Sequence, residues 1–412
     1  MLGKDSHEYE HLSTDTVVAY IRSAPDLASQ LDLDLDDVAT IEEVGDGNLN
    51  LVFIIEDRFR RGVVLKQALP YVRLVGPEWP MTPERSRHEC DALRIHAQLA
   101  ASALPRVYAY DRSRYITAME DLSDHRVWRA ALNDGERHDG AAEAMGTYIA
   151  AYAFGTSVFG MEPEDHKASI GRAINPELCR ITEDLVFTEP YADIGRNSVE
   201  PANEVDAAEL AADATMVAEI GQAKWTFMTS AEALIHGDLH TGSVMVRGSG
   251  DEVSVKAIDP EFSFYGPVAF DLGALWGNYV IAAARALALD DNDRAMWCLD
   301  LVPRTWSAFE RSFLARWPER RSPEVFTDEF GASVMQRWLT ETWLFAAAKM
   351  ARRIVGLAKT SDIETLPLPH KVGAARGVLR VARMAVRERH VDAAPEHFVE
   401  QAFATLAESA TP

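Results

Sequence analysis

The periodicity of apolar residues changes along the chain, and this change limits the possible folds most strongly. From Ile41 to Glu120, runs with strand character alternate with turns: IEEV, NLVFII, GVVLKQAL, RVYAYD and RYITAME. One helical run, PERSRHECDALRIHAQL, interrupts them. From Ala141 onward helical patterns dominate, apart from short strand-like runs between Ile235 and Phe270. The sequence therefore predicts an α+β, two-lobed fold with an antiparallel β-rich N-lobe and a mainly helical C-lobe.

Three parts follow from this pattern. Residues 1–40 are expected to form an N-terminal helical cap, with one or two short helices between positions 14 and 38. Residues 41–120 form the predicted β-rich lobe. Residues 121–412 form the predicted helical lobe, which carries a hairpin around HGDLH and VKAIDPEF.

Charge and cysteine content exclude several classes of function. The chain has 41 basic and 64 acidic residues, a formal net charge of −23, which repels nucleic acid and anionic membranes. Any nucleotide site must therefore overcome this charge locally. Three widely spaced cysteines suit neither a disulfide framework nor a zinc site, and the first residues lack the apolar stretch of a signal peptide. We expect a cytoplasmic protein with no membrane role.

Two acidic motifs indicate phosphoryl transfer. Asp238 lies in IHGDLH, and Asp259 and Glu261 lie in AIDPEF. Phosphoryl transfer needs one carboxylate to orient the attacking hydroxyl and others to hold Mg²⁺ beside the phosphates. We assign the first role to Asp238 and the second to Asp259 and Glu261. In an extended segment, which Pro260 would favour, residues 259 and 261 point to the same side.

A plainer interpretation makes these aspartates turn residues. The ordered pair of motifs favours the catalytic interpretation, since isolated short motifs fail more often than ordered pairs. His236 and His240 differ, because neither belongs to a metal-ligand spacing such as H-E-x-x-H. We expect structural roles for both histidines.

A glycine-containing hairpin precedes a strand lysine. VGDGNLN, residues 44–50, lies between two predicted strands and reads either as a plain turn or as a loop folded over phosphates, with Asn50 near the nucleotide. Lys66 on the next strand suits a phosphate-binding lysine, and Glu89 on the following helix is expected to orient it through an ion pair. Glu120, Asp121 and Leu122 close the last strand, as a hinge that meets adenine or as a helix start.

The order of these elements resembles the protein-kinase-like fold of small-molecule phosphotransferases. The longer motifs are similar to those of the 5-methylthioribose kinases: GDGNLNLVF, KQALPYVRLVGPEWP, MEDLS, NPELC, HGDLHTGS, DPEFSFYGPVAFDLG and RRIVGLA. The resemblance runs from about Ile41 to Ala358. Ser243 stands where many related kinases have a metal-binding asparagine, although the resembling family also has serine.

This resemblance implies transfer of the γ-phosphate of ATP to the anomeric 1-hydroxyl of 5-methylthioribose, giving the 1-phosphate in methionine salvage. Asp238 would contact and activate the sugar hydroxyl, and the twin arginines Arg352 and Arg353 would reach the sugar site. Asp259 and Glu261 would bind Mg²⁺. The implied nucleotide-binding set is Asn50, Lys66, Glu89, Glu120, Asp121, Leu122, Asp259, Pro260 and Glu261. The resemblance also implies a homodimer.

Two other functions remain open from the sequence. The same fold could phosphorylate an aminoglycoside, choline, homoserine or another sugar, because fold alone does not choose the acceptor. A catalytically silent nucleotide-binding protein is the alternative from another class. It fits less well, since Lys66, Asp238, Asp259 and Glu261 are all present.

Overall fold

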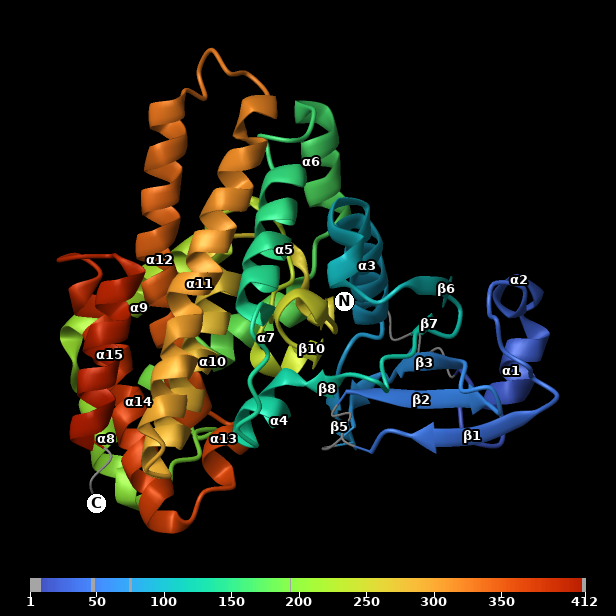
Figure 1. Cartoon of the computed structure of the whole chain (residues 1–412), viewed down its shortest axis with the longest axis horizontal. Coiled ribbons are helices and arrows are strands. Elements are labelled where there is room, and N and C mark those ends of the chain that lie inside the picture. Colours follow the sequence, from blue (N-terminus) through green and yellow to red (C-terminus); the bar gives the residue numbers. More distant parts are fainter. Residues whose placement is uncertain (1–8, 46–48, 74–75, 193, 410–412) are drawn as a thin grey trace. The chain divides into compact units, whose positions relative to one another are not determined.

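The computed structural model describes residues 9–45, 49–73, 76–192 and 194–409, and the chain divides into two units, residues 1–124 and 125–412 (Figure 1). The first unit holds the strand-rich part of the sequence and the second holds most of the helices. This confirms the predicted α+β fold, with an antiparallel sheet in the N-terminal part and a mainly helical C-terminal part.

A five-stranded antiparallel sheet forms the centre of the first unit, in the order β1-β2-β3-β7-β6. All five strand-like runs of the sequence form its strands: β1 Val38–Glu43, β2 Asn50–Asp57, β3 Gly62–Ala68, β6 Val107–Asp111 and β7 Ile116–Glu120. A short hairpin of β4 (Tyr71–Val72) and β5 (Gly76–Pro80) follows β3. The predicted helical run forms α3 (Arg85–Ala100).

One face of this sheet packs against the N-terminal helices α1 (Val17–Ser23) and α2 (Pro25–Ala28). Their buried residues Val17, Ile21 and Leu27 share a core with Val63 and Leu65 of β3. Successive side chains of a strand point to opposite faces, so the residue after Leu65 points away from this core. That residue is Lys66, and the alternation directs it to the face contacted by α3.

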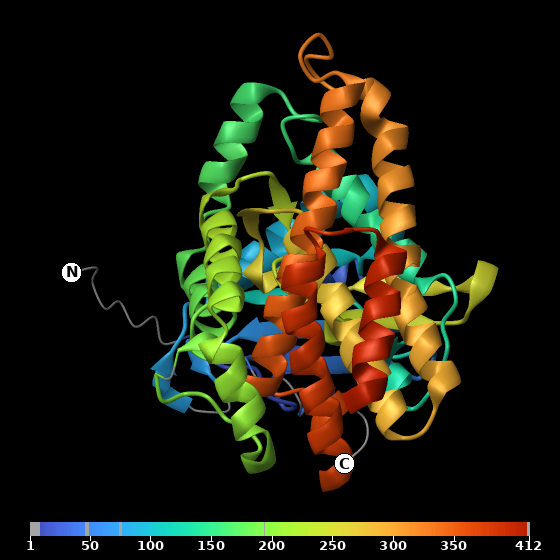
Figure 2. The ribbon, with the colours of Figure 1, turned by 90° about the vertical axis from the view of Figure 1, so that its left-hand side faces the viewer.

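Long helices build the second unit. They are α5 Ala141–Gly155, α6 Pro163–Arg172, α7 Pro176–Leu185, α8 Glu204–Ala212, α9 Ala214–Thr229, α10 Ala269–Ala288, α11 Asn292–Arg316, α12 Asp328–Val355, α14 Leu368–Glu388 and α15 Pro395–Ser409. Two shorter helices are α4 (Trp128–Asn133) and α13 (Ser361–Glu364). Helix α5 packs along α11, and α10 packs against both α11 and α12 (Figure 1). Helices α14 and α15 pair with each other (Figure 2).

Two small sheets are set among these helices. Strands β10 (Val244–Arg247), β11 (Ser254–Ala257) and β8 (Arg126–Val127) form one, in the order β11-β10-β8. Strands β9 (Ala233–Ile235) and β12 (Phe264–Gly266) form the other. The predicted strand-like runs between Ile235 and Phe270 are thereby confirmed. The turns that connect these strands contain Asp238 and Asp259.

Helix α10 is buried on nearly every side, as its almost wholly apolar sequence predicts. It approaches α12 closely at Gly273. A Cβ added there would lie 2.6 Å from the Cβ of Phe345 and 2.7 Å from the backbone nitrogen of Ala346. Glycine is therefore needed at this contact, because neither neighbouring backbone atom can move without shifting a helix.

Among the described residues, no helix combines the length and the apolar character that crossing a membrane requires. The assignment of nucleotide binding to residues 41–120 and of sugar binding to residues 121–412 stays a prediction.

Replacing Gly273 with alanine tests the close contact between α10 and α12. We expect Gly273→Ala to lower the free energy of unfolding by about 1–3 kcal/mol, the usual cost of overpacking. Gly221→Ala is the matched control, because Gly221 is an exposed position of α9 with no atom within 4 Å of an added Cβ. It should stabilise the protein slightly through helix propensity.

Urea unfolding followed by tryptophan fluorescence provides the measurement, since eight of the nine tryptophans lie in residues 125–412. An unchanged midpoint for Gly273→Ala would show that the two helices can separate without cost.

Candidate active site

The turn after β9 carries Asp238, and its backbone is held by a close approach to a second turn. Gly237 has a φ of +84°, and a Cβ there would lie 2.2 Å from the carbonyl oxygen of Phe262. Only glycine fits both the left-handed conformation and this contact. The segments around Asp238 and Asp259 are consequently fixed against each other.

Asp271 on α10 fixes the backbone of the Asp238 turn through hydrogen bonds. Its Oδ2 accepts hydrogen bonds from the backbone N–H of His236 (2.8 Å) and from the hydroxyl of Tyr152 (2.8 Å), and its Oδ1 accepts from the N–H of Gly237 (3.1 Å). Burial raises the pKa of Asp271, and its hydrogen-bond donors offset part of that effect. The sequence analysis missed this residue, although it stands in the motif DPEFSFYGPVAFDLG.

His236 has the structural contacts expected of it. Its Nδ1 accepts from the backbone N–H of Asp238 (3.3 Å), so the ring proton lies on Nε2, which donates to the carbonyl oxygen of Ile258 (2.9 Å). This side chain joins the Asp238 turn to the segment that precedes Asp259.

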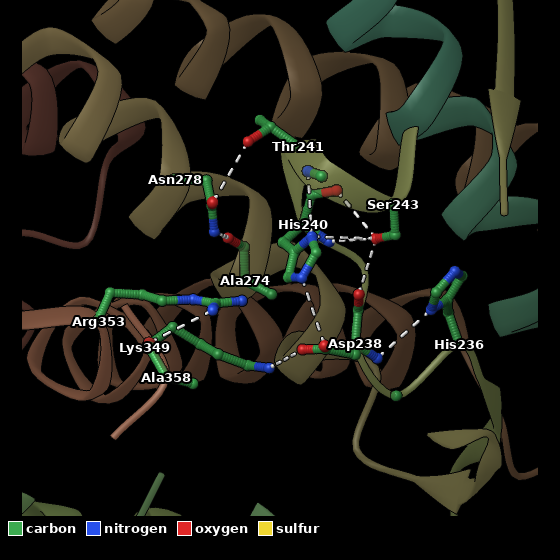
Figure 3. Close-up of polar contacts among 12 residues, drawn as sticks. His236, Asp238, His240, Thr241, Ser243, Ala274, Asn278, Lys349, Arg353 and Ala358 are labelled. Carbon is green, nitrogen blue, oxygen red and sulfur yellow. Dashed lines mark hydrogen bonds and ion pairs between the residues drawn. The ribbon is translucent and has the colours of Figure 1, made fainter. Parts of the chain in front are cut away.

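His240 also supports the loop, but it contacts Asp238 as well. Its Nδ1 accepts from the N–H of Gly242 (3.1 Å), and its Nε2 lies 3.4 Å from Oδ2 of Asp238 (Figure 3). Because Nδ1 is an acceptor, the neutral ring carries its proton on Nε2 and directs it at the carboxylate. Burial lowers the pKa of His240 to about 3, so the ring is neutral at physiological pH. Ser243 donates to the carbonyl oxygen of Asp238 (2.8 Å), which closes the loop.

The Asp238 carboxylate faces cations from α12. Oδ1 accepts a hydrogen bond from Nζ of Lys349 at 2.8 Å (Figure 3). Nη1 of Arg352 lies 3.9 Å from the same oxygen. Burial alone would raise the pKa of Asp238. Lys349, His240 and Arg352 lower it, and the resulting pKa lies well below the usual value. Asp238 is thus ionised at neutral pH, with 21% of its side chain exposed.

Lys349 is the principal residue that the sequence analysis missed. A signal was available, because Lys349 precedes Arg352 and Arg353 by three and four residues, the spacing that places side chains on one face of a helix.

The two arginines have different surroundings. Arg352 lies near Asp238, whereas Nη1 of Arg353 is 3.4 Å from the carbonyl oxygens of Ala358 and Lys359. Burial lowers the pKa of Arg353 and of Arg352. Together with Lys349, the two arginines make this end of α12 locally positive, despite the acidic character of the whole chain.

The segment containing Asp259 and Glu261 is not extended, and that part of the sequence prediction is wrong. Asp259 adopts the left-handed conformation (φ 63°, ψ 44°), and Pro260–Phe262 form a short 3-10 helix. Asn175 of the NPELC motif holds this turn by donating to the carbonyl oxygens of Glu261 (2.9 Å) and Ser263 (3.1 Å). These tertiary contacts override the preference of a residue before proline for extended backbone.

Among the described residues, no group of three or more His, Cys, Asp or Glu side chains is arranged to hold a metal. Magnesium does not need one, since it is usually bound by one or two carboxylates together with phosphate oxygens and water. Asp259 and Glu261, two residues apart in one turn, provide a donor set of this kind.

In the first unit, Lys66 and Glu89 form the expected ion pair. Nζ of Lys66 lies 2.8 Å from Oε1 of Glu89, and only 7% of Lys66 is exposed. Alternation along β3 directs the lysine to α3, where Glu89 is buried. The ion pair accounts for this burial, because lysine is rarely buried unless it is paired.

Asn50 begins β2, and its Oδ1 accepts a hydrogen bond from Arg85 (3.1 Å). The buried Arg85 guanidinium also donates to the carbonyl oxygens of Leu49 and Leu69. Arg85 was not singled out from the sequence. It fixes Leu49 and Asn50, the end of the predicted glycine hairpin that leads into β2. Residues 46–48 of that hairpin lie outside the described residues.

The predicted hinge follows β7. Glu120 pairs with Arg106 through its backbone N–H and through Oε2, and Asp121 accepts from the N–H of Ser123 in a local turn. Leu122 is buried. The Glu120 and Asp121 side chains therefore stabilise the end of the sheet.

Replacing Asp271 with asparagine tests how strongly the core fixes the Asp238 turn. The amide presents a donor where the carboxylate accepts N–H and O–H groups, so at least one buried donor loses its partner. We expect Asp271→Asn to lower the free energy of unfolding by about 2 kcal/mol. Turnover should fall by about tenfold to a hundredfold, because the turn is displaced.

Asp300→Asn is the control, since Asp300 forms an exposed ion pair with Arg304 on α11, and such pairs contribute little. Urea unfolding and initial rates check both variants. Wild-type stability together with wild-type turnover in Asp271→Asn would contradict the role given to this carboxylate.

Comparison with known proteins agrees with this arrangement. The sequence model of the phosphotransferase enzyme family matches residues 40–310. Methylthioribose kinase from Geobacillus kaustophilus is 39% identical over 360 residues, which cover 86% of this chain and 89% of the relative. Methylthioribose kinase from Pectobacterium atrosepticum is 36% identical over 389 residues, which cover 92% and 94%.

Among solved structures, a choline kinase from Cryptosporidium parvum Iowa II covers 96% of this chain and 99% of its own at 11% identity, with a TM-score of 0.47. This likeness is remote, and the family assignment rests on the sequence matches. These sequence matches confirm the resemblance to the methylthioribose kinases that the motifs indicated. The chain belongs to the phosphotransferase enzyme family and, within it, to the methylthioribose kinases.

Proposed function

We propose that the chain transfers the γ-phosphate of ATP to the 1-hydroxyl of 5-methylthioribose and releases 5-methylthioribose 1-phosphate, a step of methionine salvage. The observation that carries this proposal is the ionised Asp238 among Lys349, Arg352 and His240, in a chain that matches methylthioribose kinases over most of its length. Such a transfer requires a negative oxygen that accepts a hydrogen bond from the sugar hydroxyl. It also requires cations that neutralise the charge of the phosphates.

Asp238 orients the hydroxyl in this proposal. A carboxylate oxygen accepts the hydrogen bond of the 1-hydroxyl and turns the oxygen lone pair toward the γ-phosphorus. The bond from the sugar oxygen to phosphorus forms as the bond to the departing ADP oxygen breaks. Little covalent chemistry is left to the protein, so positioning and charge carry the catalysis.

The cations of α12 contact the sugar, the phosphoryl group and Asp238 in this proposal. Arg352 and Arg353 bind the sugar and offset the charge that spreads over the phosphoryl oxygens in the transition state. Lys349 contacts Asp238 directly. Arg353, with its hydrogen bonds to residues 358 and 359, also fixes the turn after α12.

The nucleotide is assigned to residues of the first unit and to the acidic turn of the second. Lys66, held by Glu89, would bind phosphate oxygens, with Asn50 at the start of β2 beside it. The segment from Glu120 to Leu122 would meet the adenine. Asp259 and Glu261, on either side of Pro260, would hold Mg²⁺, which neutralises phosphate charge when bound.

A panel of acceptors tests the proposal. With ATP and Mg²⁺, we expect ADP release with 5-methylthioribose to exceed that with choline, homoserine, an aminoglycoside or ribose by at least about a hundredfold in kcat/KM, because a site built for one hydroxylated ligand rejects others by such factors. Chelation of the metal should abolish the release. Faster turnover of another acceptor would reject the substrate, and rapid turnover under chelation would reject the metal.

We also propose that the protein is a cytoplasmic homodimer, as expected from the family resemblance. Light scattering during size-exclusion chromatography measures the mass of the particle and so tests the dimer. A mass of two chains at micromolar concentration is the expected result, and the mass of a single chain would remove the dimer from the proposal.

A further inference from the structure

The Lys349 ammonium group has unusual surroundings. Only 3% of the residue is exposed, and Nζ lies 2.8 Å from Oδ1 of Asp238 and 4.3 Å from the centre of the Phe270 ring. A buried ammonium costs several kcal/mol unless it is paired. A lysine placed there for packing alone would be poorly suited to the site, since an apolar residue would pack as well at lower cost.

The two carboxylate oxygens of Asp238 have unequal surroundings. Oδ1 takes the short hydrogen bond from Lys349 and has Arg352 at 3.9 Å. Within the part of the chain that the structure describes, Oδ2 has only the longer 3.4 Å contact with the neutral His240 ring. Figure 3 shows Lys349 and His240 meeting the carboxylate from different sides. An incoming hydroxyl therefore competes with a weaker donor at Oδ2 than at Oδ1.

We propose that Lys349 is a positioning residue that occupies Oδ1 of Asp238, so that the carboxylate stays ionised and presents Oδ2 to the hydroxyl of the substrate. This inference rests on the proposed function, in which Asp238 orients that hydroxyl. It deepens that function by assigning each carboxylate oxygen its own partner.

The pairing determines when the proton moves. With Lys349 beside it, Asp238 is a weak base, since protonating it would leave a buried ammonium without its counter-charge. The sugar oxygen therefore bonds to the γ-phosphorus, and the bond to the ADP oxygen breaks, before the hydroxyl proton passes to Oδ2 and then to solvent. Late proton transfer suits a loose transition state, in which the nucleophile carries little charge.

The charged and titratable groups that face this cluster come from several elements of the second unit. They are Lys349, Arg352 and Arg353 of α12, His236 and His240 after β9, Arg129 of α4, Asp271 of α10 and Asp362 of α13. Burial lowers the pKa of Lys349, and Asp238 opposes that change. Lys349 is the strongest of the opposite charges that act on Asp238, so its removal should raise the pKa of that carboxyl.

Lys349→Met tests the inference. We expect kcat to fall by about tenfold to a hundredfold, with KM for the sugar changed less, because the hydroxyl is still bound but poorly oriented. The acid limb of the kcat profile should move upward by about 1–3 pH units, the usual effect of losing an adjacent opposite charge. Lys349→Arg, which keeps the charge, should leave the acid limb near its wild-type position.

Lys371→Met is the matched control. Lys371 is also a largely buried lysine of the second unit, paired with Glu364 (2.7 Å) and Glu200 (3.2 Å), and it lies outside the proposed site. Its loss should leave the pH profile unchanged. If Lys349→Met also keeps the wild-type pH profile and kcat, Lys349 does not act on Asp238.

A double variant keeps the test decisive if Lys349→Met does not fold. Asp238→Asn with Lys349→Met removes both members of the pair, so neither of the two is left as an unpaired buried charge. If Lys349 acts through Asp238, the double variant should have the kcat of Asp238→Asn within about threefold, which is the non-additivity of coupled residues.

A further loss of more than about tenfold in the double variant would show that Lys349 acts on the substrates directly and would overturn the inference. The single variant Asp238→Asn separates the proposed role of Asp238 from the proposed role of Lys349. Unchanged turnover in that single variant would reject the proposed role of Asp238, whereas a large loss leaves only the role of Lys349 in question.

Discussion

The hydrogen bonds of Asp271 are the interaction on which the rest of the site depends. This carboxylate lies in the core on α10, yet its oxygens accept from two consecutive backbone N–H groups of the Asp238 turn and from Tyr152 on α5. A buried carboxylate is tolerated only when its oxygens are satisfied in this way. The conformation of the Asp238 turn is thus determined by two core helices, and a loop that would otherwise be mobile becomes part of the interior.

The local charge at this turn is opposite to that of the whole molecule. A net charge of −23 repels ATP at long range, but one end of α12 carries Lys349, Arg352 and Arg353, and the first two of these lie within 4 Å of the Asp238 carboxylate. Burial lowers the pKa of each of these cations, because water no longer stabilises its charge. A further anion bound among these cations would stabilise their charges, which fits a site that receives a phosphoryl group.

Periodicity and motif order predicted the parts of the structure that depend on local sequence. The strands of the first unit could be predicted because each is a short apolar run bounded by turn residues. Lys66 could be paired with Glu89 because the strand lysine and the helix glutamate follow each other closely in the sequence. Lys349 was missed because it meets Asp238 across 111 residues, through the packing of α12. The turn at Asp259 was predicted wrongly for a similar reason, since Asn175 and the contact with Gly237 impose it.

The contact between α10 and α12 links stability to catalysis. Phe270 of α10 packs edge-on against Phe345 of α12 and lies beneath the Lys349 ammonium, while Gly273 brings the two helices together one turn further along α10. The same interface therefore contributes apolar burial and sets the position of Nζ. A shift between the two helices would therefore change the distance from Nζ of Lys349 to Asp238, because the lysine stem is buried in a closely packed interior. The position of the proposed catalytic carboxylate thus depends on the packing of α10 against α12, and residues of this interface are constrained by function as well as by stability.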